Sequence, residues 1–280
     1  MISKRQLGKT GVMVSLFSLG GEAAIEKRDQ AHAAETIINH ALDLGVNYMD
    51  TSPTYGDGGS EENIGRVMAY RRQDVFLSTK THDRTYDGTM RLLESSLTRL
   101  QTDHLDMYQI HDIRQPEDLE TIFDHDGALR AVIELKDQGV IRFLGITSHK
   151  VPDVLLEGIR RYPFDCILCA LNAGDIHHAP FTKELIWEAS KRDMGIIAMK
   201  VTAVGRIFKE GGLTSMQQAL GYTCSYPIST AIVGVSNVQQ VEENVAIATD
   251  FKPFTELEMR QLESLTAPYA YDANFFKHEW

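Results

Sequence analysis

Cysteine is scarce in this sequence, with three residues among 280. So few cysteines leave no disulfide framework and indicate a reducing compartment. Cys166 and Cys169 have C-x-x-C spacing, but they fall in a strand-like run, where positions i and i+3 face opposite sides of a sheet. We therefore expect buried thiols there. No second pair of ligands accompanies His177 and His178, so no metal site is expected.

Long apolar runs, linkers and excess positive charge are absent as well. No run approaches the ~20 apolar residues that a membrane span needs, and the first residues show no secretory pattern. Basic residues number 28 against 39 acidic ones, a net charge of −11, which argues against nucleic acid or an anionic membrane as partner. A cytoplasmic protein is expected. Without a Pro/Gly/Ser-rich linker, residues 1–280 are expected to form a single domain.

The two common phosphate-binding loops are missing too. No G-x-G-x-x-G follows a strand-like run, and no G-x-x-x-x-G-K-[ST] occurs. Any nucleotide must therefore bind in another way.

Strand-like runs alternate with amphipathic, helix-like stretches along the chain. The strand candidates are residues 16–19, 46–50, 75–79, 105–110, 140–146, 165–169, 195–199 and 229–233. The helix candidates are residues 30–44, 60–69, 87–100, 125–138, 150–161, 180–192, 213–224 and 237–248, with a final one at 255–267. This alternation predicts an α/β fold, a (β/α)8 TIM barrel, with an open doubly wound sheet as the competing topology. Residues 2–15, with a turn at 8–11, predict an N-terminal β-hairpin that covers the amino-end face of the barrel.

Four side chains with useful chemistry stand at or after the ends of these runs. Asp50, Lys80 and His111 close the runs VNYMD, VFLSTK and LDMYQIH, and Tyr55 follows the first run after the turn-rich TSPT. The carboxyl ends of parallel strands share one rim of a barrel, where active sites lie. A phenol, an ammonium, a carboxylate and an imidazole on one rim predict carbonyl reduction.

The expected chemistry follows from these four groups. A tyrosine titrates near pH ~10 and is a poor acid at neutral pH. The Lys80 ammonium is expected to lower the pKa of Tyr55, and Asp50 to keep the lysine charged. Tyr55 then protonates the developing alkoxide, while His111 orients the carbonyl.

Each of these residues also has an ordinary structural interpretation. A strand-end lysine beside an aspartate is usually an ion pair, and a lone histidine is usually a loop residue. The four together favour catalysis. Asp112 is interpreted as structural. His82 and His149 also end strand-like runs and are candidates for lining the same pocket.

Several segments resemble the aldo-keto reductase family almost from end to end. They are LGKTGVMVSLFSLGG, GVNYMDTSPTYGDGGSEENIGRVM, VFLSTK, DHLDMYQIH, GVIRFLGITSH and VGVSNVQQVEEN. The resemblance implies one barrel that binds an extended nicotinamide dinucleotide without a Rossmann unit. It implies NADP(H), with NAD(H) as a second candidate, and either a small aldehyde or ketone that is reduced or the corresponding alcohol or sugar that is oxidised. It also makes Tyr55 the proton donor, Lys80 and Asp50 its modulators, and His111 the group that orients the substrate.

The resemblance also implies a set of cofactor contacts, with departures from the common family pattern. Thr147-Ser148 stands where many members have Ser-Asn, Asn172 follows the position of a usual Gln, and Met199 with Lys200 replaces a stacking Tyr. The segment at the cofactor's adenosine end supplies Gly234, Ser236, Asn237, Gln240, Glu243 and Asn244.

Asn237 and Gln240 have capping-box spacing at the start of the eighth helix, whose free N–H groups suit a phosphate. The segment GVSNVQQVEEN contains no Lys or Arg, so we expect unusually good use of NADH for this family. A regulatory subunit that binds nucleotide and turns over slowly is the alternative to an enzyme. An intact set of four catalytic residues favours the enzyme.

Overall fold

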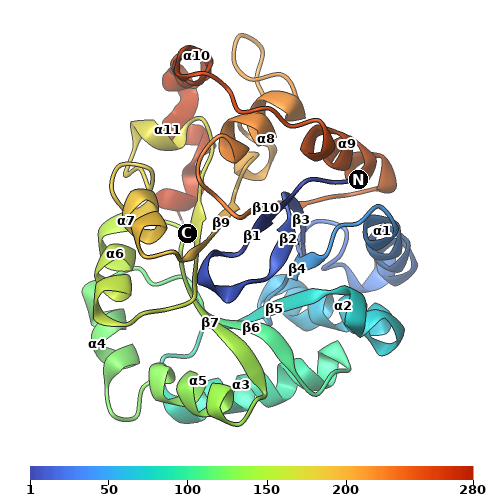
Figure 1. Cartoon of the computed structure of the whole chain (residues 1–280), viewed down its shortest axis with the longest axis vertical. Helices are drawn as coiled ribbons and strands as arrows, with labels where there is room; N and C mark the ends of the chain where they lie inside the picture. Colours follow the sequence, from blue (N-terminus) through green and yellow to red (C-terminus); the bar gives the residue numbers. More distant parts are fainter. Residues whose placement is uncertain (280) are drawn as a thin grey trace.

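Eight parallel strands close into a barrel in the computed structural model, which describes residues 1–279 (Figure 1). The strands are β3 (Phe17–Gly20), β4 (Tyr48–Asp50), β5 (Phe76–Thr81), β6 (Leu105–Ile110), β7 (Ile141–Ser148), β8 (Cys166–Ala170), β9 (Gly195–Met199) and β10 (Thr230–Gly234). Strand β10 pairs in parallel with both β9 and β3, which closes the ring. The predicted TIM barrel is confirmed, and the open doubly wound sheet is excluded.

Helices surround the barrel (Figure 1). They are α1 (Ala31–Asp43), α2 (Gly59–Arg71), α3 (Tyr86–Leu100), α4 (Pro116–Phe123), α5 (Ala128–Asp137), α6 (Pro152–Arg161), α7 (Leu185–Lys191), α8 (Met216–Cys224), α9 (Val238–Thr249), α10 (Glu256–Thr266) and α11 (Ala270–Ala273). Helix α10 begins with a capping box formed by Thr255 and Glu258. Helices α4 and α11 were not predicted. Helix α4 is short, but Pro116 at its first position and a capping box formed by Gln115 and Asp118 define its start.

A hairpin closes the amino end of the barrel, as predicted. Strands β1 (Lys4–Gln6) and β2 (Met13–Ser15) pair antiparallel and lie in front of the amino end of the barrel in Figure 1. Leu7 and Val14 are buried in an apolar cluster with Tyr48 and Met107 from the barrel strands. Gly8 lies in the left-handed region (φ 48°), and a Cβ there would stand 2.2 Å from the backbone nitrogen of Gly195. Only glycine permits this close approach of hairpin and barrel.

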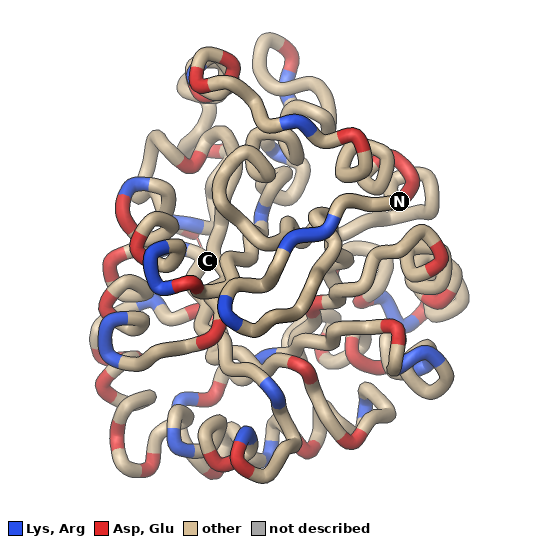
Figure 2. The backbone as a smooth tube through the Cα atoms, viewed as in Figure 1, with Lys and Arg blue, Asp and Glu red and all other residues tan. Residues whose placement is uncertain are grey.

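The hydrophobic core has two parts, one inside the barrel and one between the strands and the helices. Cys166 belongs to the inner cluster and Cys169 to the outer one, so the two thiols face opposite sides of the sheet, as predicted. Both are buried and free, as is Cys224. Charged residues gather on the surrounding helices and loops (Figure 2). Within residues 1–279, no helix has the length and apolar character needed to cross a bilayer.

Candidate active site

Lys80, near the carboxyl end of β5, lies at the centre of the candidate site. Its side chain is fully buried. The ammonium donates to Asp50 Oδ2, to the carbonyl oxygen of Thr51 at 2.8 Å and to the phenol oxygen of Tyr55 at 3.2 Å. An ammonium has three hydrogens, so these three bonds use all of its donor capacity. The hydrogen of the Tyr55 hydroxyl is therefore directed elsewhere than to Lys80.

Asp50 connects three neighbouring strands. It ends β4, binds Lys80 of β5 and accepts a hydrogen bond from Gln109 Nε2 of β6 at 2.8 Å. The same Gln109 nitrogen donates to Ser78 Oγ at 2.8 Å. Burial raises the pKa of Asp50, whereas Lys80 and Gln109 lower it. Asp50 thus holds the lysine through one oxygen and is itself held by Gln109 through the other.

Tyr55 lies in the loop after β4, at the start of a 3-10 turn. The residue is partly exposed to the cavity, yet burial raises the pKa of its phenol well above the ordinary value, with Glu22 and Asp50 adding to the increase. The expectation of a lowered Tyr55 pKa is wrong in direction, because desolvation and nearby carboxylates outweigh the lowering effect of one ammonium. The phenol therefore stays protonated at neutral pH, which is the form that a proton donor needs.

His111 directly follows β6 and faces Tyr55, with the two ring centroids 6.3 Å apart. Burial and the nearby Lys80 ammonium lower the pKa of His111 well below its ordinary value, so the ring is neutral. Its Nδ1 lies 3.5 Å from Ser52 Oγ, and its Nε2 is buried without a hydrogen-bond partner. A hydroxyl that donates to Nδ1 leaves the ring hydrogen on Nε2. The structure thus brings the four predicted residues together.

Two cavities meet at Tyr55. One, of about 840 Å³, runs past Asp50 toward the start of α9, and the other, of about 720 Å³, extends over His111. Glu22, Glu26 and Tyr55 line both. We call them the long cavity and the polar cavity.

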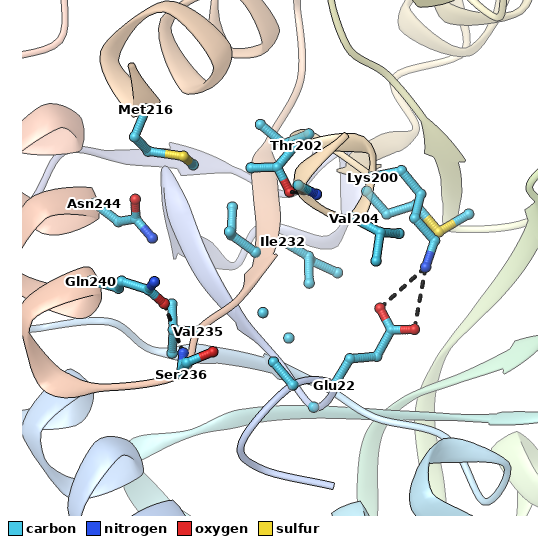
Figure 3. A pocket seen from close by; sticks show the side chains of 18 of the residues that line it. Glu22, Lys200, Thr202, Val204, Met216, Ile232, Val235, Ser236, Gln240 and Asn244 are labelled. Atoms are coloured by element: carbon cyan, nitrogen blue, oxygen red, sulfur yellow. Dashed lines mark hydrogen bonds and ion pairs between the residues drawn. The ribbon is translucent and has the colours of Figure 1, made fainter. Parts of the chain in front are cut away.

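Seven of the eleven predicted cofactor residues line the long cavity, and Figure 3 labels Lys200, Ser236, Gln240 and Asn244 among them. They are Met199, Lys200, Gly234, Ser236, Gln240, Glu243 and Asn244. Lys200 forms an ion pair with Glu22, with Nζ 3.1 and 3.2 Å from the two carboxylate oxygens. It is the only basic residue that lines this cavity among the residues that the structure describes.

The other predicted cofactor residues line neither cavity. The Thr147 hydroxyl accepts a hydrogen bond from the Asp112 amide at 2.7 Å, and the Ser148 hydroxyl donates to the carbonyl of Ile113 at 2.8 Å. The Asn172 amide nitrogen donates to the carbonyl of Lys200 at 3.0 Å. These side chains connect loops of the barrel rim, so the structure does not bring them to the predicted contact.

The start of α9 differs in detail from the prediction. Asn237 caps the helix by accepting from the Gln240 amide at 3.0 Å, but Gln240 Oε1 accepts from the Ser236 amide at 2.7 Å (Figure 3). These side chains therefore engage the first-turn amide of Gln240 and the amide of Ser236, which precedes the helix. The first-turn amides of Val238 and Gln239 have no intrahelical acceptor by the geometry of any helix start, and they remain donors for an anion.

Sequence reasoning missed Glu22 and Glu26. Glu22 stands two residues after β3, so the rule that identified the other strand-end residues applies to it as well. His82 and His149, the two candidates for lining the pocket, both line the polar cavity. In the part of the chain that the structure describes, no group of three or more His, Cys, Asp or Glu side chains is arranged to hold a metal ion.

Comparison with known proteins decides the family. The profile described as Aldo/keto reductase family matches residues 16–211. The chain belongs to this family. It is similar to the Uncharacterized oxidoreductase YqkF of Bacillus subtilis, with 28% identity over 314 aligned positions. The alignment covers 97% of this chain and 99% of the relative. It is also similar to Aldo-keto reductase yakc [NADP(+)] of Schizosaccharomyces pombe, with 28% identity over 198 residues, 66% of this chain and 54% of the relative.

Similarity to solved structures supports the same family assignment. The holo form of aldo-keto reductase AKR11C1 from Bacillus halodurans superposes with a TM-score of 0.79 at 27% identity and covers 95% of this chain and 96% of its own. This aldo-keto reductase is thus a member of a family of NAD(P)-dependent oxidoreductases that act on carbonyl compounds.

The two opposite pKa shifts predict a flat pH profile for carbonyl reduction. Tyr55 keeps its proton below a raised pKa, and His111 stays neutral above a lowered pKa. Both are in the required form between those limits, so kcat/KM should change little from about pH 6 to about pH 9. A profile of kcat/KM at saturating coenzyme tests this. An ascending limb with a midpoint near ~6.5 would instead indicate a histidine that titrates at its ordinary value.

Proposed function

We propose that this aldo-keto reductase reduces the carbonyl group of a small aldehyde or ketone, or oxidises the corresponding alcohol, with Tyr55 as the proton donor. The observation that carries the proposal is the complete use of the Lys80 hydrogens on Asp50, Thr51 and Tyr55. It leaves the Tyr55 hydrogen for a ligand in the cavity, opposite the buried Nε2 of His111.

Each of the four residues has a separate role in the proposed reaction. A nicotinamide dinucleotide, when bound, supplies the hydride that reaches the carbonyl carbon. Tyr55 gives its proton to the carbonyl oxygen, because the alkoxide that forms there is a stronger base than a phenolate. Lys80, held by Asp50, stabilises the negative charge left on Tyr55. His111 donates from Nε2 to the same oxygen, which fixes its position and disperses its charge.

The long cavity suits a nicotinamide dinucleotide. It begins beside Asp50 and Tyr55 and ends at Ser236 and Gln240, where the first turn of α9 offers amide donors and the positive end of the helix dipole to a phosphate. Its volume of about 840 Å³ lies within the range of cofactor sites. Its lining residues are the contacts that we propose for the coenzyme.

Regulatory binding of a nucleotide with slow turnover is the second candidate. The buried ion pair beside Tyr55 favours the enzyme, because holding a nucleotide in the long cavity does not require a phenol positioned by an ammonium. A multiple-turnover assay with small aldehydes distinguishes the two.

Tyr55→Phe should lower kcat by about a hundredfold or more, because a positioned acid typically contributes at least that factor. The change leaves the ring that lines the cavities and removes only the hydroxyl, so coenzyme affinity should change little. Steady-state kinetics together with a coenzyme titration measure both.

Tyr70→Phe is the matched control, because Tyr70 is exposed and its hydroxyl donates to Glu35. It should leave kcat unchanged. If Tyr55→Phe keeps more than about a tenth of the wild-type kcat, Tyr55 is not the general acid.

Coenzyme choice should be relaxed, with NADH working well beside NADPH. Lys200 is engaged by Glu22, and Arg206 stacks on the ring of Phe275 at 3.7 Å and does not line the cavity. A 2′-phosphate would therefore lack a charged, bidentate partner. We expect kcat/KM for NADPH to exceed that for NADH by less than about a thousandfold, and a greater excess would contradict this account of the cavity.

Gln240→Arg should raise the preference for NADPH over NADH by about tenfold or more, since a charged hydrogen bond is worth ~1.5–3 kcal/mol. Gln239→Arg is its control, because it adds the same charge on the neighbouring residue, which is exposed and does not line the cavity. Equal effects of the two substitutions would mean that the response is to net charge alone.

A further inference from the structure

Asp112 and His149 form a rigid pair on the wall of the polar cavity. His149 Nδ1 lies 2.8 Å from Asp112 Oδ1, and the His149 amide donates to the same oxygen at 3.0 Å. The other Asp112 oxygen accepts from Arg114 Nε at 2.6 Å, while the Asp112 amide donates to the Thr147 hydroxyl. Although burial alone would raise the pKa of Asp112, its contacts with His149 and Arg114 lower it below the ordinary value. Asp112 is therefore a fixed carboxylate.

This carboxylate determines which nitrogen of His149 carries the hydrogen. His149 Nδ1 and Asp112 Oδ1 are 2.8 Å apart, although the N–H···O angle is not that of a straight hydrogen bond. Without a hydrogen between them, the lone pairs of the two atoms would repel each other at this distance. Nδ1 therefore carries the ring hydrogen. Burial lowers the pKa of His149, against the opposing effect of Asp112, which indicates a neutral ring. In a neutral ring with its hydrogen on Nδ1, Nε2 is a hydrogen-bond acceptor only.

The position of His149 relates it to the substrate. Its ring centroid is 5.7 Å from that of His111, and both rings line the polar cavity together with Tyr55. A carbonyl oxygen bound by Tyr55 and His111 places the neighbouring carbon of the substrate in the same cavity. Apart from the Tyr55 ring, the described residues that line this cavity are all polar or charged, with no aliphatic side chain among them. An apolar substituent would desolvate these groups without replacing their hydrogen bonds.

We propose that His149 is a specificity-determining residue that accepts a hydrogen bond from a hydroxyl group on the carbon next to the reacting carbonyl. The substrates are then α-hydroxy aldehydes or ketones, or the matching vicinal diols in the oxidative direction. An α-oxo group has only acceptor oxygens, and an unsubstituted carbon has neither donor nor acceptor. This inference rests on the proposed carbonyl reduction and adds the substrate class.

Three aldehydes that differ only at the second carbon test the proposal: 2-hydroxypropanal, propanal and 2-oxopropanal. Each is assayed with the wild-type protein and with His149→Phe, which keeps a ring of similar size but removes the acceptor. We expect kcat/KM for 2-hydroxypropanal to fall about tenfold or more in the variant, since a lost hydrogen bond leaves the hydroxyl unpaired. The values for propanal and 2-oxopropanal should change by less than about threefold. Comparing each aldehyde between the two proteins cancels its intrinsic reactivity.

If His149→Phe lowered kcat/KM equally for all three aldehydes, the proposal would be overturned. A merely structural role of His149 would have the same effect whatever group the second carbon of the aldehyde carries. A loss for 2-oxopropanal as large as that for 2-hydroxypropanal would overturn it too, because it would mean that Nε2 donates. His149→Gln, whose amide oxygen also accepts, should retain more of the preference for 2-hydroxypropanal than His149→Phe, and it replaces the Phe variant if that one does not fold. Failure of the wild-type protein to reduce any of the three would overturn the proposed function itself.

Discussion

The buried ammonium of Lys80 is the interaction on which the rest of the site depends. A fully buried charge loses several kcal/mol of hydration free energy. The Lys80 ammonium offsets this loss with hydrogen bonds to three acceptors. The first acceptor, Asp50, is the last residue of β4, the second is the carbonyl of Thr51 directly after it, and the third is Tyr55 in the following loop. One cation therefore determines the position of the loop and the direction of the phenol hydrogen. Substitution of any member leaves another charge or polar group buried without its partner.

Strand register supplies this cation with its partners. Asp50 of β4 stands opposite Ser78 of β5, and Lys80 of β5 stands opposite Gln109 of β6. Side chains alternate along a strand, so these four share the interior face. The hairpin fills the amino end of the barrel with Leu7 and other apolar side chains, which leaves the carboxyl end as the mouth for chemistry. Barrel closure and catalytic geometry are thus two results of the same register.

The sequence predicts those features that depend on periodicity and strand ends. It therefore locates the barrel, the hairpin and Tyr55 with its three partners Asp50, Lys80 and His111, while the assignment of the whole chain to one domain stays a prediction. It does not reveal burial, and so the direction of the Tyr55 pKa shift was predicted wrongly. It also does not show which polar side chains are already engaged within the protein, as Thr147 and Ser148 are. Helix α4 was missed because its eight residues are too few for a periodic pattern.

The most direct test of this account is single-turnover hydride transfer in the double variant Asp50→Asn/Lys80→Met. The two changes remove both buried charges together, so neither is left unpaired, and Tyr55 keeps its hydroxyl but loses its ammonium. The account predicts a transfer rate about a hundredfold or more below that of the wild-type protein, with coenzyme affinity nearly unchanged. A rate within about tenfold of wild type would show that Tyr55 needs neither Lys80 nor Asp50 to deliver its proton.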